Sequence, residues 1–205
     1  MKTLFIDAKI KSKVDQSLIK KISKKLPNNI AIAYSIQYKD NSIKIKEILS
    51  KKHKITKLTQ VLGCFKQTFP KDTQAILLIS SGKFHGISLA YETKLPVYIL
   101  ENNKLEKVSS KEVEILKKRQ KASYVKFLNA EKIGIIVSSK PGQQKLKRAL
   151  NFKKKLKNKN SYLFISNNIN IEEFENFKID SWVNTACPRL DMNSSSIMDL
   201  NKIKL

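Results

Sequence analysis

Short runs of apolar residues alternate along the chain with longer segments in which apolar residues recur every three or four positions. A continuous apolar run of about four to eight residues is typical of a strand buried on both faces of a parallel sheet. The longer period is typical of an amphipathic helix. Because the two patterns alternate, the sequence predicts βα units and parallel sheets.

The predicted elements form two successive sets. The first set has strands over residues 4–6, 30–36, 76–80 and 97–100, and helices over residues 15–25, 39–52 and 84–91. A long charged helix is predicted over residues 110–130, with packing residues Val113, Leu116, Val125 and Leu128. The second set has strands over residues 133–137, 162–165 and 182–185, and a helix over residues 143–157. We therefore expect an α/β protein of two tandem Rossmann-like or flavodoxin-like units, which 205 residues allow.

The charge balance is strongly basic, with 41 lysine and arginine residues against 17 acidic residues and a net charge of +24. Such a balance indicates a polyanionic partner such as nucleic acid. Only three of the basic residues are arginine, however, and arginine is the side chain best suited to recognise bases and phosphates. Abundant lysine, asparagine and isoleucine also follow from A- and T-rich codons. The charge allows a nucleic-acid partner but does not favour one, and runs such as Lys153-Lys154-Lys155 are most simply solvated helix faces.

Three features of the sequence bear on its compartment. No apolar run approaches the roughly 18 residues of a membrane span. The first residues show no secretory signal. Two cysteines in such a chain favour free thiols or metal ligands over a disulfide framework. We therefore expect a soluble, cytoplasmic protein with no membrane partner.

The two cysteines stand in similar surroundings. Cys187 follows an apolar run and precedes a proline, and Cys64 follows another apolar run and the glycine at position 63. Each is expected beyond the carboxyl end of a strand, where open parallel sheets bind ligands, so the two thiols suggest one shared site. Two thiolates do not complete a zinc site, whereas an iron–sulfur cluster can gather distant cysteines and keep one iron open with three. Spacing alone favours buried, inert cysteines.

Four segments carry a resemblance to a known family. They are Gln60-Val61-Leu62-Gly63-Cys64, Ser81-Gly82-Lys83-Phe84-His85, Val137-Ser138-Ser139-Lys140-Pro141-Gly142-Gln143 and Thr185-Ala186-Cys187-Pro188-Arg189. In order and spacing they resemble the archaeal 2-(3-amino-3-carboxypropyl)histidine synthases of diphthamide synthesis. The similarity covers nearly the whole chain but only about the last two thirds of the family protein.

The resemblance implies a division of the chain. Family members have three similar α/β units, each giving one cysteine to a central 4Fe-4S cluster, and the first unit is missing here. By this resemblance, residues 1–7 are the closing strand of the missing unit and residues 8–109 the second unit. Residues 110–129 are a bridging helix and residues 130–205 the third unit. Cys64 and Cys187 then correspond to the second and third cluster ligands, with no catalytic residue beyond the cluster.

The resemblance also implies an activity. In the family the open iron holds S-adenosylmethionine, and the reduced cluster cleaves its Cγ–S bond. The resulting 3-amino-3-carboxypropyl radical adds to a histidine of translation elongation factor 2. The implied cofactor-binding residues are Gly82, His85, Gly142 and Gln143, with Gly82 allowing close backbone approach and His85 and Gln143 forming hydrogen bonds.

Three of these residues also have a structural interpretation. Gly82 makes a turn between a strand and a helix in any case. His85 is equally interpretable as a core or cap residue, and Gln143 as a helix cap. The second histidine, His53, is expected to be exposed in a loop among lysines.

We expect the chain to be the C-terminal part of a split transferase of this family. A separate N-terminal fragment would carry the first cluster cysteine, and the assembly would be dimeric. One alternative is a non-catalytic accessory subunit of the same enzyme. The other is a basic RNA- or ribosome-associated α/β protein with structural cysteines.

Overall fold

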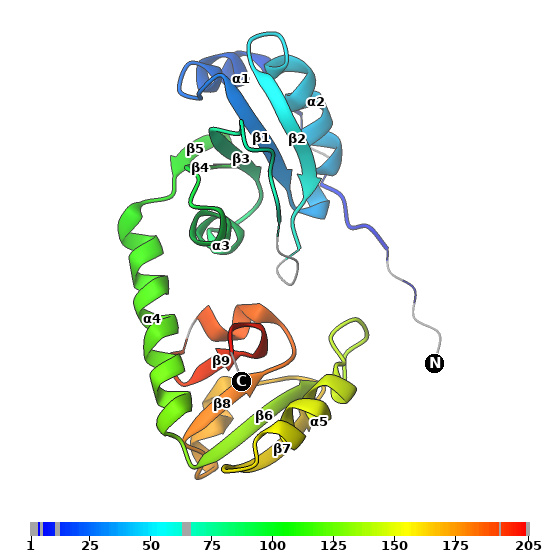
Figure 1. Ribbon diagram of the computed structural model, residues 1–205. Helices are drawn as coiled ribbons and strands as arrows, with labels where there is room; N and C mark the ends of the chain where they lie inside the picture. The colour runs from blue at the N-terminus through cyan, green and yellow to red at the C-terminus, as the bar shows by residue number, and fades with distance from the viewer. Residues whose placement is uncertain (1–3, 5, 11–12, 63–66, 193, 204–205) are drawn as a thin grey trace. The chain divides into compact units, whose positions relative to one another are not determined.

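A computed structural model describes residues 4, 6–10, 13–62, 67–192 and 194–203 of the chain (Figure 1). The chain divides into two compact units, Met1–Glu114 and Ile115–Leu205. The boundary falls inside helix α4 (Ser110–Asn129), so this helix belongs partly to each unit. Each unit has its own sheet and its own hydrophobic core.

The first unit contains a five-stranded sheet with the order β2-β1-β3-β4-β5. Its parallel strands are β1 (Asn29–Tyr34), β2 (Lys54–Gln60), β3 (Ala75–Ile79) and β4 (Val97–Glu101). The fifth strand, β5 (Lys104–Lys107), is antiparallel to β4. Asn102 and Asn103 join these two strands with φ angles of 44° and 64°, as a tight hairpin turn requires. The first sheet is therefore parallel, as expected, except at this added edge strand.

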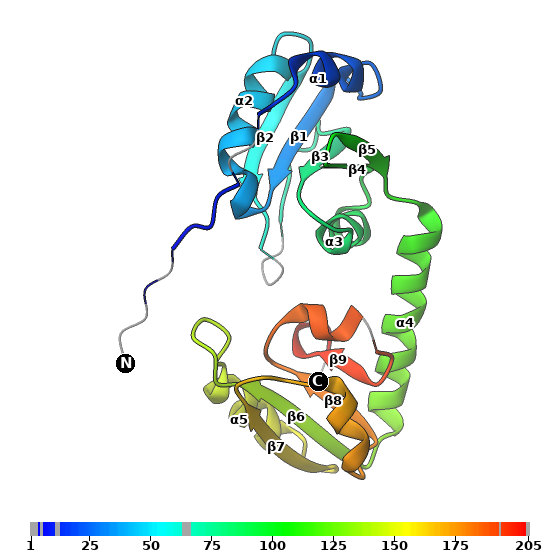
Figure 2. The ribbon, with the colours of Figure 1, turned by 180° about the vertical axis from the view of Figure 1, so that it is seen from behind.

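Helices cover both faces of the first sheet (Figures 1 and 2). Apolar residues of α1 (Gln16–Ser23) and α2 (Lys39–Leu49) pack on one face, and α3 (Phe84–Thr93) packs on the other. All five residues of β3 are buried, which agrees with its continuous apolar sequence. The result is a three-layer α/β unit.

His53 is not the exposed loop residue that the sequence predicts. Its ring is half-buried, with Nδ1 2.8 Å from the carbonyl oxygen of Pro27 and Nε2 2.7 Å from the hydroxyl of Ser23. A neutral ring that donates from Nδ1 to the carbonyl leaves Nε2 to accept from the hydroxyl. His53 thus fastens the end of α1 to the start of β2.

The second unit contains a four-stranded parallel sheet with the order β7-β6-β8-β9. The strands are β6 (Lys132–Ser138), β7 (Asn160–Ser166), β8 (Ser181–Asn184) and β9 (Ile197–Asp199). Helix α5 (Leu146–Lys155) and Phe127 of α4 pack on one face. Trp182 and residues of the 3-10 helix η2 (Ile171–Asn176) cover the other. Lys153, Lys154 and Lys155 are exposed at the end of α5, which confirms them as a solvated helix face.

An aromatic cluster fills the second face of this sheet. The rings of Phe174 and Trp182 are stacked with centroids 4.2 Å apart, and Phe164 meets Trp182 edge to face at 4.6 Å. Gly134 on the neighbouring strand makes room for the indole, because a Cβ there would overlap Cε3 and Cζ3 of Trp182. The glycine is therefore a packing requirement of this strand.

Several boundaries differ from the sequence-based expectation. Helix α5 begins at Leu146 rather than at residue 143, and α4 buries Leu116 and Phe127 while Val125 and Leu128 stay about half exposed. Strands β2, β5 and β9 are additional to the predicted set. In the predicted strand over residues 4–6, the described residues Leu4 and Ile6 are 82% exposed and join neither sheet.

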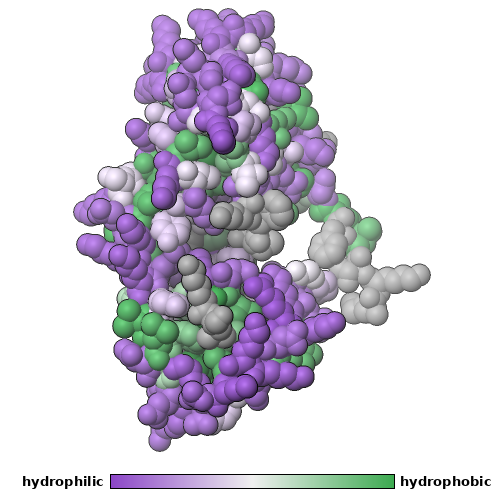
Figure 3. All heavy atoms as spheres, viewed as in Figure 1, coloured by the Kyte–Doolittle hydropathy of each residue, from purple (hydrophilic) through white to green (hydrophobic). Residues whose placement is uncertain are grey.

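The face drawn in Figure 3 is rich in hydrophilic side chains. Within the described ranges, lysines form ion pairs at positions 9, 54, 83 and 202. None of the helices described here is long and apolar enough to cross a membrane.

Candidate functional site

The strand order creates a topological switch point in each unit. In both units the chain pairs its second strand on one side of the first strand and its third strand on the other. In open α/β sheets, ligands bind beyond the carboxyl ends of the strands where the order reverses in this way. The loops after β1 and β3, and those after β6 and β8, flank this switch point.

Most of the residues proposed from the sequence follow switch-point strands. Gly82 and His85 come directly after β3, Gly142 and Gln143 come after β6, and Cys187 comes after β8. Cys64 differs, because it follows the edge strand β2, and residues 63–66 lie outside the described residues. The two cysteines therefore do not occupy equivalent positions in the two units.

Cys187 is a free, half-exposed thiol between β8 and the 3-10 helix η3 (Pro188–Met192). The preceding Asn184 is 2% exposed. Its Oδ1 accepts a hydrogen bond from the Ala186 amide at 2.8 Å, and its Nδ2 donates to the Cys187 carbonyl at 2.7 Å. The Leu190 amide donates to the same carbonyl at 3.1 Å. The backbone at Cys187 is thus held from both sides.

Thr185 extends the pairing of β8 with β6. Both its amide, at 3.1 Å, and its hydroxyl, at 2.7 Å, donate to the carbonyl of Ile136. Sequence reasoning assigned no role to Asn184 or Thr185. The signal that could have found them is an adjacent pair of polar residues ending an apolar strand, because buried polar groups require partners.

A second buried carboxamide, that of Gln67, bonds to the end of β2, the strand that precedes Cys64 in the sequence. Gln67 is 8% exposed, donates from Nε2 to the Gln60 carbonyl at 2.9 Å and accepts at Oε1 from the Thr59 hydroxyl at 3.2 Å. At the other end, the Val61 amide donates to the Tyr34 carbonyl at 2.8 Å. These bonds hold the described residues on either side of positions 63–66.

Gly82 adopts a left-handed conformation with φ of 73°. A Cβ there would meet no atom within 4 Å, so its backbone angle, rather than crowding, requires glycine. Its amide donates to Oε1 of Glu101 at 3.0 Å. This turn delivers the chain from β3 to α3, as the sequence predicts.

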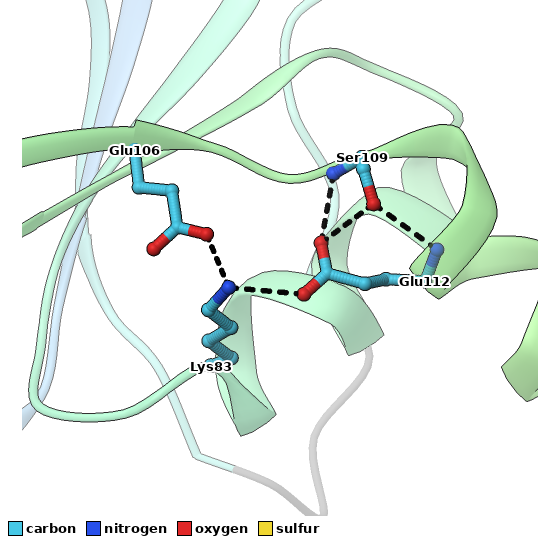
Figure 4. Close-up of polar contacts among 4 residues, drawn as sticks. All are labelled: Lys83, Glu106, Ser109 and Glu112. Atoms are coloured by element: carbon cyan, nitrogen blue, oxygen red, sulfur yellow. Dashed lines mark hydrogen bonds and ion pairs between the residues drawn. The ribbon is translucent and has the colours of Figure 1, made fainter.

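Lys83, beside Gly82, is held by two carboxylates (Figure 4). Its ammonium forms ion pairs with Glu106 and, at 3.1 Å, with Glu112. Both carboxylates raise the pKa of Lys83, and Glu106 has the larger effect. Glu112 accepts from the Ser109 amide at 2.9 Å, and the Glu112 amide donates to the Ser109 hydroxyl oxygen at 3.2 Å, which forms a capping box at the start of α4. The Ser109 hydroxyl also donates to the Glu112 carboxylate at 2.8 Å. Hydrogen bonds from Ser109, above all from its amide, lower the pKa of Glu112 against the opposing effect of burial.

His85 lies in the first turn of α3 and is half-buried. Its ring meets Phe84 edge to face with centroids 4.8 Å apart. It lines a small cavity of about 20 Å³ together with Val61, Leu62 and Gln67. The structure therefore brings His85 next to the segment that leads to Cys64.

Gly142 and Gln143 lie in a turn before α5. Gly142 has φ of 78°, and the Gln143 amide donates to the Lys140 carbonyl at 3.0 Å. Since α5 begins at Leu146 with Lys145 in the cap position, Gln143 does not cap this helix. Its half-buried side chain remains a candidate for ligand contact.

A buried ion pair lies behind the Cys187 segment. Asp191 of η3 is 4% exposed and pairs with the Lys202 ammonium at 2.7 Å, while its Oδ1 has no hydrogen-bond partner. Burial raises the pKa of Asp191, and the nearby Lys202 opposes this rise. The pair connects η3 to the segment after β9.

A cavity in the second unit is lined by none of the site residues predicted from the sequence. It measures about 170 Å³ and is lined by Trp182, Phe164, Phe174 and residues of the β7–η2 connection. Across the described ranges, no group of three or more histidine, cysteine or acidic residues is placed to hold a metal.

These features define a class: a tandem α/β protein whose switch-point loops carry a thiol and two positive-φ glycines. Residues 1–197 match the family described as "Putative diphthamide synthesis protein", and the chain belongs to this family.

Two relatives carry the name 2-(3-amino-3-carboxypropyl)histidine synthase. The Pyrococcus horikoshii protein is 29% identical over 205 residues, covering 93% of this chain and 60% of the relative. The Methanocaldococcus jannaschii protein is 30% identical over 168 residues, covering 78% of this chain and 45% of the relative. This chain thus spans less than two thirds of the length of these relatives.

Solved structures agree with this assignment. The crystal structure of Dph2 from Pyrococcus horikoshii superposes with a TM-score of 0.75 at 26% identity, covering 89% of this chain and 59% of that one. The structure of the same protein with a 4Fe-4S cluster gives a TM-score of 0.74 at 28% identity, covering 90% and 58%. The tandem Rossmann-like architecture expected from the sequence is confirmed.

Proposed function

We propose that this chain forms the second and third units of a diphthamide synthase that transfers a 3-amino-3-carboxypropyl group to a histidine of elongation factor 2. The donor would be S-adenosylmethionine. One observation carries the proposal: a chain of this family presents a half-exposed cysteine at the switch point of its second sheet.

Cys64 and Cys187 would be the ligands that this chain gives to a 4Fe-4S cluster. The donor chemistry fits, because thiolates are the usual protein ligands of such clusters and can come from distant parts of the sequence. Residues 1–205 contain two cysteines, and we assign the third thiolate of the cluster to a separate chain. When bound, the cluster would supply the electron for cleavage of the donor's Cγ–S bond.

The residues of this chain would bind and orient the donor. The positive-φ turns at Gly82 and Gly142 let the backbone approach a ligand closely. His85 and Gln143 would form hydrogen bonds to its polar groups. Such positioning, together with the exclusion of water, is the contribution that a protein makes to cofactor chemistry.

A separate N-terminal fragment is the proposed partner. Leu4 and Ile6 belong to a segment in which both of these apolar side chains are exposed, and neither residue joins a sheet of this chain. Such a segment can complete the sheet of a missing first unit, since strand addition satisfies backbone donors and acceptors. The fragment would carry the first cysteine, and the assembly would contain two copies of each chain.

Anaerobic co-purification of the chain with candidate partners tests the proposal. We expect about four irons per complex, by the stoichiometry of a 4Fe-4S cluster, and loss of this iron and its paramagnetic resonance signal in Cys64→Ala and Cys187→Ala. Lys154→Ala, on the exposed face of α5, is the control and should keep its iron. Full iron loading in both cysteine variants would contradict the proposal.

The accessory-subunit alternative makes a different prediction for the same complex. There, both cysteine variants would leave S-adenosylmethionine cleavage unchanged while the complex still assembled. An RNA-associated protein would instead show RNA affinity that falls steeply with salt, with no iron in any complex.

A further inference from the structure

We propose that Asn184 is a positioning residue that fixes the orientation of the Cys187 thiol. The proposal rests on the proposed function for the use made of that thiol, and on hydrogen bonds within one unit for the positioning itself.

The Asn184 carboxamide is the central connection of this turn. It is buried, and its two polar atoms bond to backbone groups two and three residues ahead, at 2.8 Å and 2.7 Å. An aspartate or leucine of similar shape could form only one of these bonds or neither. Asparagine is therefore the residue that both accepts from Ala186 and donates to Cys187.

The Cys187 carbonyl is the point where two elements meet. It accepts from the Asn184 side chain, at the end of β8, and from the Leu190 amide, within η3. Pro188 adds a third restraint, because a residue that precedes proline is disfavoured in the helical region. The backbone that carries the Cys187 thiol is thus fixed on both sides.

Such order matters for a ligand residue. A cysteine on a loose loop would lose conformational entropy on binding, whereas a fixed loop loses little. Asn184 would accordingly favour ligand binding at Cys187 without touching the ligand.

Asn184→Leu removes both hydrogen bonds at nearly constant volume and adds no charge near the thiol. Thr185→Val is the matched control: it is also polar to apolar at similar size and burial, 3% exposed, but affects the bond to Ile136 instead. Asn184→Ser provides a second, milder test should the leucine variant fold poorly.

The readout is the alkylation rate of each cysteine in the reduced, full-length chain, measured by mass spectrometry after timed exposure to iodoacetamide. Cys64 serves as an internal reference for general unfolding. We expect the Cys187 to Cys64 rate ratio to rise about fivefold in Asn184→Leu, as the loss of buried hydrogen bonds predicts, and to stay unchanged in Thr185→Val. An unchanged ratio in both Asn184 variants would overturn the proposal.

Iron retention in the assembled complex separates this inference from the proposed function. With both correct, Asn184→Leu should lose iron to a chelator faster than Thr185→Val does. If Cys187→Ala keeps its iron, the proposed function fails while the alkylation ratio still decides the role of Asn184. If Cys187→Ala loses its iron but the ratio does not move, the positioning role fails alone.

Discussion

Four strands have the same order in both units, but the units differ in the segment that follows the third strand, which is β3 in the first unit and β8 in the second. After β3, the Gly82 turn begins the ten-residue helix α3. After β8, the same position holds Cys187 and the five-residue 3-10 helix η3. One unit uses the position to start a covering helix, and the other uses it to present a thiol. A shared strand order therefore does not imply equivalent residues beside the switch point.

The second difference concerns one face of each sheet, the face covered by α3 in the first unit and by Trp182 in the second. The first unit packs α3 there, with Gly86 close to Ile99 and Val108, whereas the second packs Trp182 over Gly134. An added Cβ at position 86 meets the flexible end of the Ile99 side chain, which can move aside, whereas one at position 134 meets the rigid indole of Trp182, which cannot. Gly134→Ala should therefore destabilise by about 1–3 kcal/mol, as overpacking does, and Gly86→Ala by less. Urea unfolding followed by circular dichroism measures both, and equal losses would break the comparison.

Gly82→Ala tests whether the first unit's turn depends on backbone angle alone. Since a Cβ would meet open space, the expected cost of about 1–2 kcal/mol is that of a left-handed alanine. Gly82→Asn, which tolerates positive φ better, should recover part of it. Urea unfolding of both variants provides the measurement, and an alanine variant as stable as the parent would contradict the assignment.

Gln67→Leu allows the same cysteine alkylation measurement to be made on the first unit. Loss of the bonds to Gln60 and Thr59 frees one end of the Cys64 segment. We expect the Cys64 to Cys187 alkylation ratio to rise a few-fold, about the effect of one buried hydrogen bond, which is the reverse of the Asn184 result. A shift of both rates together would show that Gln67 supports the whole unit rather than this segment.

Asp191→Asn should change the pH dependence of the second unit. Burial raises the pKa of Asp191 above 3.8, so the folded state holds this proton more tightly than the unfolded state. The stability of the parent relative to Asp191→Asn should therefore fall as pH rises from about 4 and level off above the raised pKa. Urea unfolding from acid to neutral pH measures the difference. A slope of opposite sign would mean that the Lys202 ammonium outweighs burial.

The parts of the fold predictable from the sequence are those with strong local patterns. Residues 75–79 and 133–137 are buried on both faces and form continuous apolar runs. The edge strand β2 and the short strands β5 and β9 lack such runs, so their formation depends on neighbouring strands. Similarly, α5 starts late because the turn at Lys140 takes up residues 141–144.

The candidate site also combines features that follow from local sequence patterns with features that depend on distant parts of the chain. Gly82 and Gly142 were predictable as turns, because glycine between a strand and a helix indicates a left-handed residue. The roles of Asn184 and Gln67 depend on carbonyls that only the folded chain brings within reach. The prediction for His53 was wrong for a related reason, since its partners lie about one strand and helix away in sequence.

The aromatic cluster of the second unit has a spectroscopic consequence. Trp182 is the sole tryptophan in the sequence, is 3% exposed and stacks on Phe174. Its fluorescence will therefore report the packing of the second unit alone, whereas circular dichroism reports both. If the two signals change at different urea concentrations, the two units unfold as separate cooperative blocks, each with its own midpoint.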